Sequence, residues 1–167
     1  MSSKISHSIK QRTKSKVNDV FLTPLPLAKL HIDMIEFKEN ERWLDPCKNS
    51  GNYFNQFPNE NRDYCEILEN KDFFTYSKPV DIIVQNPPYS MLDAWFKKNI
   101  ELKPRIFSML IGIANLTARR VELCQQAGYG LTKMKMLKVY KWYGMSVLVV
   151  FEQGKDSIIE INRKVWR

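Results

Sequence analysis

The chain has 167 residues, of which 44% are hydrophobic, and a formal net charge of +8. This length suits one globular domain with a buried core. No apolar run approaches the length of about 18 residues that a membrane helix needs, and no signal-peptide pattern opens the chain, so we expect no membrane partner and no secretion. The basic excess favours a polyanionic partner, above all nucleic acid.

The cysteines and histidines predict no metal site. Cys47, Cys65 and Cys124 are scattered without metal-ligand spacing, and His7 and His31 are far apart. We interpret the cysteines as reduced thiols. This predicts a cytoplasmic protein, or one located in the nucleoid or nucleus, wherever its nucleic acid lies.

Residues 1–18 are predicted to form a flexible basic arm, and residues 19–167 a single domain. The arm carries five basic side chains and no acid before residue 17: Lys4, Lys10, Arg12, Lys14 and Lys16. It can lie along phosphates, or it can be a solvated tail that only aids solubility.

The segment after the arm predicts a helix that runs to about Phe37. Thr23 is of a type that caps helices, and Pro24 suits a first helical turn. An ordinary capped amphipathic helix explains these residues without any ligand.

Two short strands with acidic ends are predicted next. The first runs from Arg42 to Asp45, before a loop of small residues in which Gly51 allows the backbone to approach a ligand closely. The second is Asp63–Ile67. Asp72 comes only six residues after Glu66, which leaves no room for a helix between strands, so we expect a trimmed sheet here. Each acid alone is more often a solvated charge than a ligand.

The most informative segment follows a buried strand over residues 80–84 and reads Asn86-Pro87-Pro88-Tyr89. The prolines end the strand and restrict the backbone before them. Asn86 is therefore expected at the carboxyl end of a strand, where open α/β sheets bind ligands. Its amide oxygen and the Pro87 carbonyl can accept both hydrogens of a planar amino group, and Tyr89 can stack on the attached base. A plain strand followed by a Pro-Pro turn is the alternative.

The second half predicts helices and strands in alternation, followed by a hairpin. A basic stretch with interleaved aromatic residues, Lys133–Lys141, predicts a half-buried strand, whose aromatics either stack on bases or pack in the core. The final segment, 157–167, either adds an edge strand or meets a partner. The expected elements are helix Met91–Leu102, strand Arg105–Ile113, helix Leu116–Ala127 and hairpin strands Leu131–Tyr140 and Ser146–Phe151.

The Asn-Pro-Pro-Tyr segment resembles the catalytic motif of S-adenosylmethionine-dependent amino methyltransferases, especially those that methylate N6 of adenine in DNA. The segment from Asp45 through Pro46 and Cys47 to Gly51 is similar to the family's cofactor motif, D-P-x-x-G-S-G. It departs from that motif at Asn49, where glycine is common, and at Lys48, which is large for such a loop. Asn is the non-glycine residue that best tolerates a left-handed backbone.

The resemblance implies a role for each matched residue. It places Asp45 beside the ammonium group of the cofactor and Glu66 on the ribose hydroxyls. The cofactor adenine would be contacted by Asp72 and Phe73, and Thr23-Pro24 would close over the methionine moiety. Asn86, with Pro87, Pro88 and Tyr89, would be catalytic.

The implied fold is a class I methyltransferase, with a mostly parallel seven-stranded sheet and helices on both faces. The implied reaction is methyl transfer to N6 of a flipped adenine in DNA. Nothing in the chain is long enough for a separate target-recognition domain, so loops, the arm, an oligomer or a partner subunit must supply specificity. Three alternatives stay open: an RNA adenine methyltransferase, a protein-glutamine methyltransferase, and an inactive nucleic-acid-binding subunit.

Overall fold

The computed structural model describes residues 21–138 and 145–162. The predicted arm, the end of the basic stretch Lys133–Lys141 and the last five residues lie outside this range. None of the described helices combines the length and apolarity of a membrane span.

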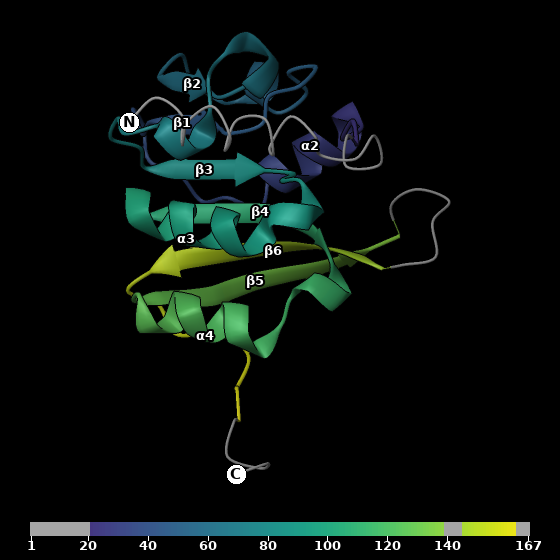
Figure 1. The fold of residues 1–167 in the computed structure, drawn as a ribbon, viewed down its shortest axis with the longest axis vertical. Coiled ribbons are helices and arrows are strands. Elements are labelled where there is room, and N and C mark those ends of the chain that lie inside the picture. The colour runs from purple at the N-terminus through teal and green to yellow at the C-terminus, as the bar shows by residue number, and fades with distance from the viewer. Residues whose placement is uncertain (1–20, 139–144, 163–167) are drawn as a thin grey trace, which may run out of the picture.

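Six strands form one mixed sheet in the described part of the chain, in the order β2-β1-β3-β4-β6-β5 (Figure 1). Strands β1 to β4 are parallel neighbours, whereas β6 pairs antiparallel with both β4 and β5. The carboxyl ends of β1, β2, β3 and β4 therefore share one edge of the sheet. The strands are β1 (Trp43–Asp45), β2 (Arg62–Tyr64), β3 (Ile82–Gln85), β4 (Ile106–Gly112), β5 (Tyr129–Leu137) and β6 (Ser146–Gln153).

We expected seven strands, and the described residues form six. The difference lies beyond β2, where the chain makes an isolated antiparallel bridge between Glu66 and Lys71. Two 3-10 turns, η3 (Ile67–Glu69) and η4 (Phe73–Thr75), follow one another closely. So short a connection cannot hold the crossover that another parallel strand requires, so β2 is the edge of the described sheet.

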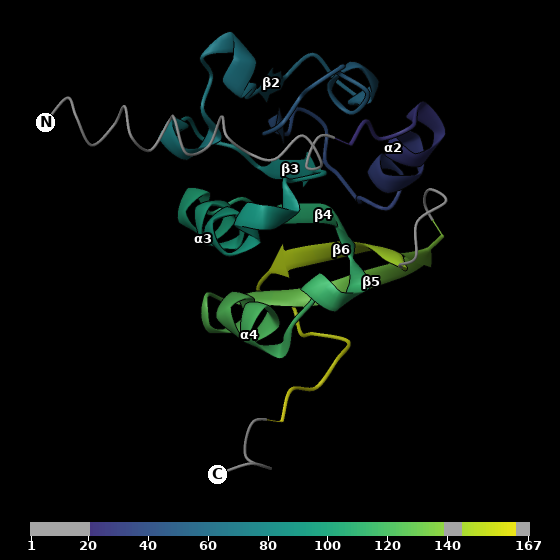
Figure 2. The ribbon, with the colours of Figure 1, turned by 45° about the vertical axis from the view of Figure 1, so that its right-hand side comes forward.

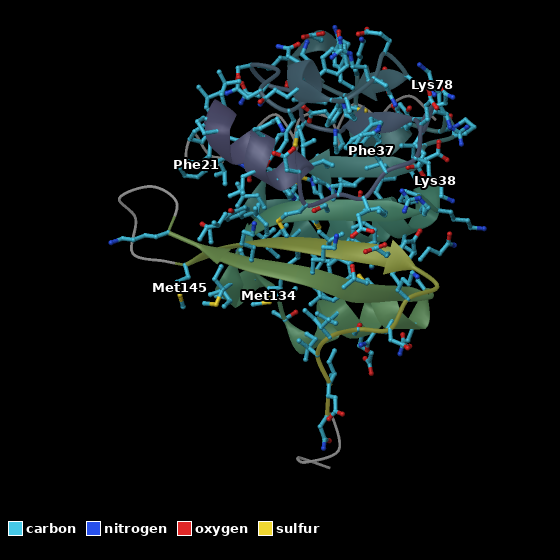
Figure 3. The ribbon with its side chains drawn as sticks, turned by 180° about the vertical axis from the view of Figure 1, so that it is seen from behind. Phe21, Phe37, Lys38, Lys78, Met134 and Met145 are labelled. Carbon is cyan, nitrogen blue, oxygen red and sulfur yellow. The ribbon has the colours of Figure 1, made fainter. Side chains whose placement is uncertain are left out.

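Helices cover both faces of the sheet, as expected (Figure 2). Helices α3 (Leu92–Leu102) and α4 (Ala118–Gln126) lie on one face, and α2 (Leu25–Ile32) lies on the other. Leu92, Trp95 and Phe96 of α3 are buried with helical spacing in the larger core cluster. On the face of α2, Figure 3 shows no helix of the described residues over β5 and β6.

Helix α2 differs from its prediction at both ends. It ends at Ile32 and not near Phe37, because a turn follows at Asp33. Pro24 occupies the N-cap position and no side chain caps the helix. The predicted capping role of Thr23 is therefore wrong, and its hydroxyl group is available to a different partner.

The chain after β6 returns along the edge of β5. Ser157 Oγ accepts a hydrogen bond from Leu131 N at 3.0 Å, and Ile158 N donates to Leu131 O at 2.9 Å. A Cβ atom on Gly130 would lie only 2.2 Å from Lys155 O, so the two backbones touch because Gly130 has no side chain. Through residue 162 this tail adds no strand, but it covers the edge with backbone contacts.

Candidate active site

Two adjoining hollows lie at the carboxyl ends of β1 and β3. The first, the polar hollow, has the polar side chains of Thr23, Asn49, Asn52 and Asn86 in its lining. The second, the aromatic hollow, has Phe73, Phe74 and Trp95 in its wall. Their common wall shows that they form one groove, and it consists of Cys47, Glu66, Ile67 and Pro88.

Asp45 lies beneath the loop that follows β1. Its side chain is fully buried, and its carboxylate accepts hydrogen bonds from Cys47 N and Phe54 N, each at 3.2 Å. Burial raises the pKa of Asp45 to about 7. In the structure this residue orders the loop from below and does not line either hollow.

The loop adopts the backbone that its sequence allows. Asn49 has φ 46° and Gly51 has φ 83°, both in the left-handed region. A Cβ atom at Gly51 would lie 2.8 Å from Asn55 Nδ2, so a side chain at position 51 would also require the Asn55 side chain to move. Asn49 therefore adopts a left-handed backbone without being a glycine, and the turn can form.

Lys48 is held by groups outside the groove. Its Nζ pairs with Glu69 Oε1 at 2.5 Å and lies 3.9 Å from the centroid of the Tyr64 ring. Lys71 Nζ contacts the same ring, at 3.6 Å. The charge of Lys48 is thus balanced by an acid and an aromatic ring, and its stem contributes to the wall of the polar hollow.

Glu66 stands where the two hollows meet. One carboxylate oxygen accepts from Asn49 N at 2.7 Å, and the other accepts from Leu68 N at 3.1 Å. These bonds tie the β1 loop to the η3 turn. A carboxylate has about four acceptor positions, so Glu66 keeps capacity for hydroxyl donors in the groove.

The aromatic hollow rests on a stack of rings. Phe73 lies 4.7 Å from Trp95, centroid to centroid, with the rings nearly parallel. Asp72 lies in the same wall, where its Oδ1 accepts from Phe74 N at 2.9 Å. Trp95 lies in the helix expected over Met91–Leu102, and its spacing in the sequence carries no sign that it borders a groove.

Asn86 has a defined orientation at the end of β3. Its Nδ2 donates to Thr23 Oγ1 at 3.1 Å and to Phe21 O at 3.3 Å. Its backbone carbonyl accepts from the Cys47 thiol at 3.2 Å, and burial together with nearby Asp45 raises the pKa of that thiol well above its ordinary value. Among the residues that the structure describes, none hydrogen-bonds Asn86 Oδ1.

The three residues after Asn86 lie in different surroundings. Pro88 lines both hollows, whereas Pro87 is buried and lines neither. Tyr89 begins the 3-10 turn η5 (Tyr89–Met91) and packs against the larger core, with Cε2 4.0 Å from a Cβ atom placed on Gly112.

A buried chain of hydrogen bonds supports the polar hollow from behind. Tyr53 OH lies 2.8 Å from His31 Nδ1, and His31 Nε2 lies 2.6 Å from Ser108 Oγ, which donates to Val149 O at 2.8 Å. Since Ser108 donates onward, His31 Nε2 carries the proton and Nδ1 accepts from Tyr53. Burial lowers the pKa of His31 to about 3, so the ring stays neutral. This series of hydrogen bonds could not be predicted, because its members lie far apart in the sequence.

The structure brings most of the sequence-predicted residues together. Those that line the groove are Thr23, Pro46, Cys47, Glu66, Asp72, Phe73, Asn86 and Pro88. Those that lie outside its lining are Pro24, Asp45, Gly51, Pro87 and Tyr89. In the described ranges, no three metal-ligating side chains are grouped.

Comparisons with known proteins find similarity in structure only. No protein-family model and no curated protein matches the chain. The M protein of the type I restriction enzyme EcoKI is 11% identical with a TM-score of 0.61, over 84% of this chain and 45% of that one.

Two further solved structures align over most of both chains. The E. cuniculi Mtq2–Trm112 complex, described as responsible for methylation of the eRF1 translation termination factor, is 16% identical, with a TM-score of 0.58 over 81% of this chain and 99% of that one. Magnesium protoporphyrin IX methyltransferase (ChlM) from Synechocystis PCC 6803, with bound SAM, is 8% identical, with a TM-score of 0.58 over 77% and 79%. The chain therefore has the α/β fold of solved methyltransferases.

Proposed function

We propose that the protein transfers a methyl group from S-adenosylmethionine to the exocyclic N6 of adenine in DNA. One observation carries this proposal: the side chain of Asn86, at the carboxyl end of β3, turns its nitrogen toward Thr23 and Phe21 and leaves its oxygen as an acceptor beside the groove. An acceptor held in this way suits a substrate that presents an amino group.

The groove fits S-adenosylmethionine in the order of its parts. A polar end with Asn49 and Asn52 suits an amino-acid moiety, a carboxylate at the junction suits a ribose with two hydroxyls, and the aromatic end suits a base. Asp72 would accept from the adenine amino group, and Phe73 and Trp95 would provide the apolar wall. The solved methyltransferase with bound SAM supports the same choice of cofactor.

Asp45, Pro46, Cys47 and Gly51 would hold this cofactor through the shape of their loop. Asp45 binds the backbone of the loop, so we propose that it acts on the cofactor through loop order and not by facing the ammonium group. When bound, the cofactor supplies an electrophilic methyl group.

The chain would catalyse transfer by positioning and electrostatics. The amino group of adenine is a poor nucleophile because its lone pair is delocalised into the ring. Asn86 Oδ1 and the Pro87 carbonyl would accept its two hydrogens, favour a more tetrahedral nitrogen and direct the lone pair at the methyl group. A duplex base must leave the stack to reach this site, and Tyr89 would stack on it after a local adjustment.

Nucleic acid, most plausibly DNA, is the partner that the charge of +8 favours. A homo-oligomer or a partner subunit would supply sequence choice. RNA adenine offers the same amino group, and a protein glutamine offers an amide nitrogen with the same two hydrogens. The protein alternative has one specific support, the similarity to a complex described as methylating a translation termination factor.

Lys48 and Asn49, the two departures from the cofactor motif, would be the main support for the inactive-subunit alternative. The positive φ of Asn49 and the pairing of Lys48 with Glu69 and Tyr64 weaken it, because both residues are accommodated without filling the groove.

The deciding experiment is radiolabelled methyl transfer to duplex DNA, single-stranded DNA, RNA and protein in parallel, with Asn86→Ala as control. We expect N6-methyladenine in DNA from the wild type only. Label on cytosine, RNA or protein would refute the proposed substrate. No transfer to any substrate, together with no cofactor binding by calorimetry, would favour the inactive subunit.

A further inference from the structure

We propose that Thr23 and the Phe21 carbonyl form a clamp that fixes the orientation of the Asn86 amide, so that Thr23 is a positioning residue and not a cofactor contact. This inference rests on the proposed function. Thr23 Oγ1 and Phe21 O lie 3.1 Å and 3.3 Å from Asn86 Nδ2. Both bonds use the same nitrogen, which has two hydrogens to give.

The clamp permits only one arrangement of the amide. The Phe21 carbonyl can accept but cannot donate, so the group that faces it must be the amide nitrogen. In a reversed amide, Asn86 Oδ1 would face Phe21 O, so two acceptors would lie against each other. Asn86 Nδ2 would then present a donor to the amino group of a substrate. The clamp therefore keeps Asn86 Oδ1 as the acceptor before any substrate arrives.

The clamp itself is anchored by the loop that follows β1. Asn52 Nδ2 donates to Thr23 O at 2.7 Å, and Gln56 Nε2 donates to Leu25 O at 3.2 Å. Thr23 is buried, and it does not cap helix α2. Its hydroxyl oxygen thus accepts a hydrogen bond from Asn86, and its backbone carbonyl accepts one from the loop that lines the polar hollow.

The clamp also explains why this chain needs Asn and not Asp at position 86. A carboxylate is the stronger acceptor for an amino group, but it has no hydrogen for the Phe21 carbonyl. Asp at this position would oppose that carbonyl, while the Thr23 hydroxyl could turn and donate to only one of its oxygens. We expect Asn86→Asp to lose activity although its substrate-facing atom is still an oxygen.

The test is single-turnover methylation of adenine-containing DNA by the full chain carrying Thr23→Val, Thr23→Ser or Asn86→Asp. Valine keeps the shape and removes the hydroxyl, so its rate should fall roughly 10- to 100-fold, the range for residues that orient a directly acting group. Serine keeps the hydroxyl and should stay within about threefold of the wild type. Cofactor affinity, measured by calorimetry, should stay unchanged in both.

The matched control is Thr132→Val, which removes a hydroxyl that bonds to Val150 O and Glu152 on the far strands of the sheet. It should leave the rate unchanged. A normal rate in Thr23→Val would overturn the clamp, and so would a variant that loses cofactor affinity in place of rate, because Thr23 would then be a cofactor contact.

A second measurement separates the clamp from the proposed function. Nuclear magnetic resonance on the free protein should show slow hydrogen exchange at the Asn86 side-chain amide in the wild type and in Thr23→Ser, and faster exchange in Thr23→Val. Equal exchange in all three would refute the clamp even if the protein methylates no substrate. Protected exchange with no methyl transfer would refute the proposed function and leave the clamp standing.

Discussion

Asn86 shows what a short motif can predict at the scale of single residues. Its place at a strand end follows from the apolar run and the two prolines. The orientation of its amide does not, because it depends on Phe21 and Thr23, which lie 65 and 63 residues away in the sequence. The same holds for the hydrogen bonds from the loop backbone to Asp45, which the sequence does not indicate.

Replacing Asn86 by Ala should strongly lower the turnover rate and leave the affinity for the cofactor unchanged. The change removes the acceptor at the amino nitrogen, and losing one preorganised polar contact of this kind costs about 100- to 1000-fold in rate. A single-turnover assay and calorimetry measure the two effects separately. A wild-type rate in this variant would show that the active site lies elsewhere.

Asp45 should make the stability of the protein fall as pH rises. Its pKa is raised from 3.8 to about 7 in the folded protein, so the folded state binds more protons than the unfolded state between these values. The contribution of Asp45 to the free energy of unfolding should be largest below pH 4, decline up to pH 7 and then level off. The decline is on the order of a few kcal/mol, at about 1.4 kcal/mol per pKa unit.

Urea denaturation between pH 4 and 8 tests this, with Asp45→Asn as reference. Carboxyl groups with a lowered pKa, such as Glu41 and Asp81, act in the opposite direction. Only the difference between wild type and variant isolates Asp45. A difference that stays constant across this pH range would contradict the prediction.

At the scale of elements, local sequence patterns predicted most helices and strands. Helices α3 and α4 and the hairpin β5–β6 lie within a few residues of their expected positions, because their apolar spacing reports burial directly. Helix α2 was overestimated, because the turn at Asp33 is not marked by glycine or proline. The role of the tail was left open, because contacts between backbones leave no trace in a hydropathy pattern.

Gly130→Ala should detach the tail from the edge of β5. The new methyl group would lie 2.2 Å from Lys155 O, and forcing extra volume into a packed site costs about 1–3 kcal/mol. Thermal unfolding should show a lower Tm, and hydrogen exchange at Leu131 and Ile158 should become faster. Ser157→Ala, which removes a hydrogen bond but leaves room, should destabilise less. Unchanged exchange in Gly130→Ala would mean that the tail contributes nothing to this edge.

At the scale of the whole molecule, an α/β fold with helices on both faces of the sheet was predicted through the family resemblance, and the number of strands was not. The short connection between Glu66 and Asp72 already indicated a trimmed sheet, and the described residues place that loss at β2. A family resemblance implies the number of strands in a complete sheet. The length of the connection between two strands limits whether a further strand can form there.

Deleting residues 1–16 should weaken DNA binding without changing sequence preference. Five basic residues are lost, and each phosphate contact contributes about 0.9 to the slope of log affinity against log salt concentration. The slope, measured by fluorescence anisotropy, should therefore become shallower. An unchanged slope would identify these residues as a solvated tail.

The bond between Phe21 O and Asn86 fixes the point from which the first residues of the chain depart. Arg12 lies nine residues before Phe21, so their backbones are at most about 30 Å apart, which is roughly nine base pairs at 3.4 Å each. A phosphate bound by Arg12 can lie farther than this from Phe21 only by the length of the arginine side chain. On long DNA, methyl groups would then accumulate within a short distance of each phosphate that the N-terminal segment binds. Their positions would depend on this distance and not on the base sequence.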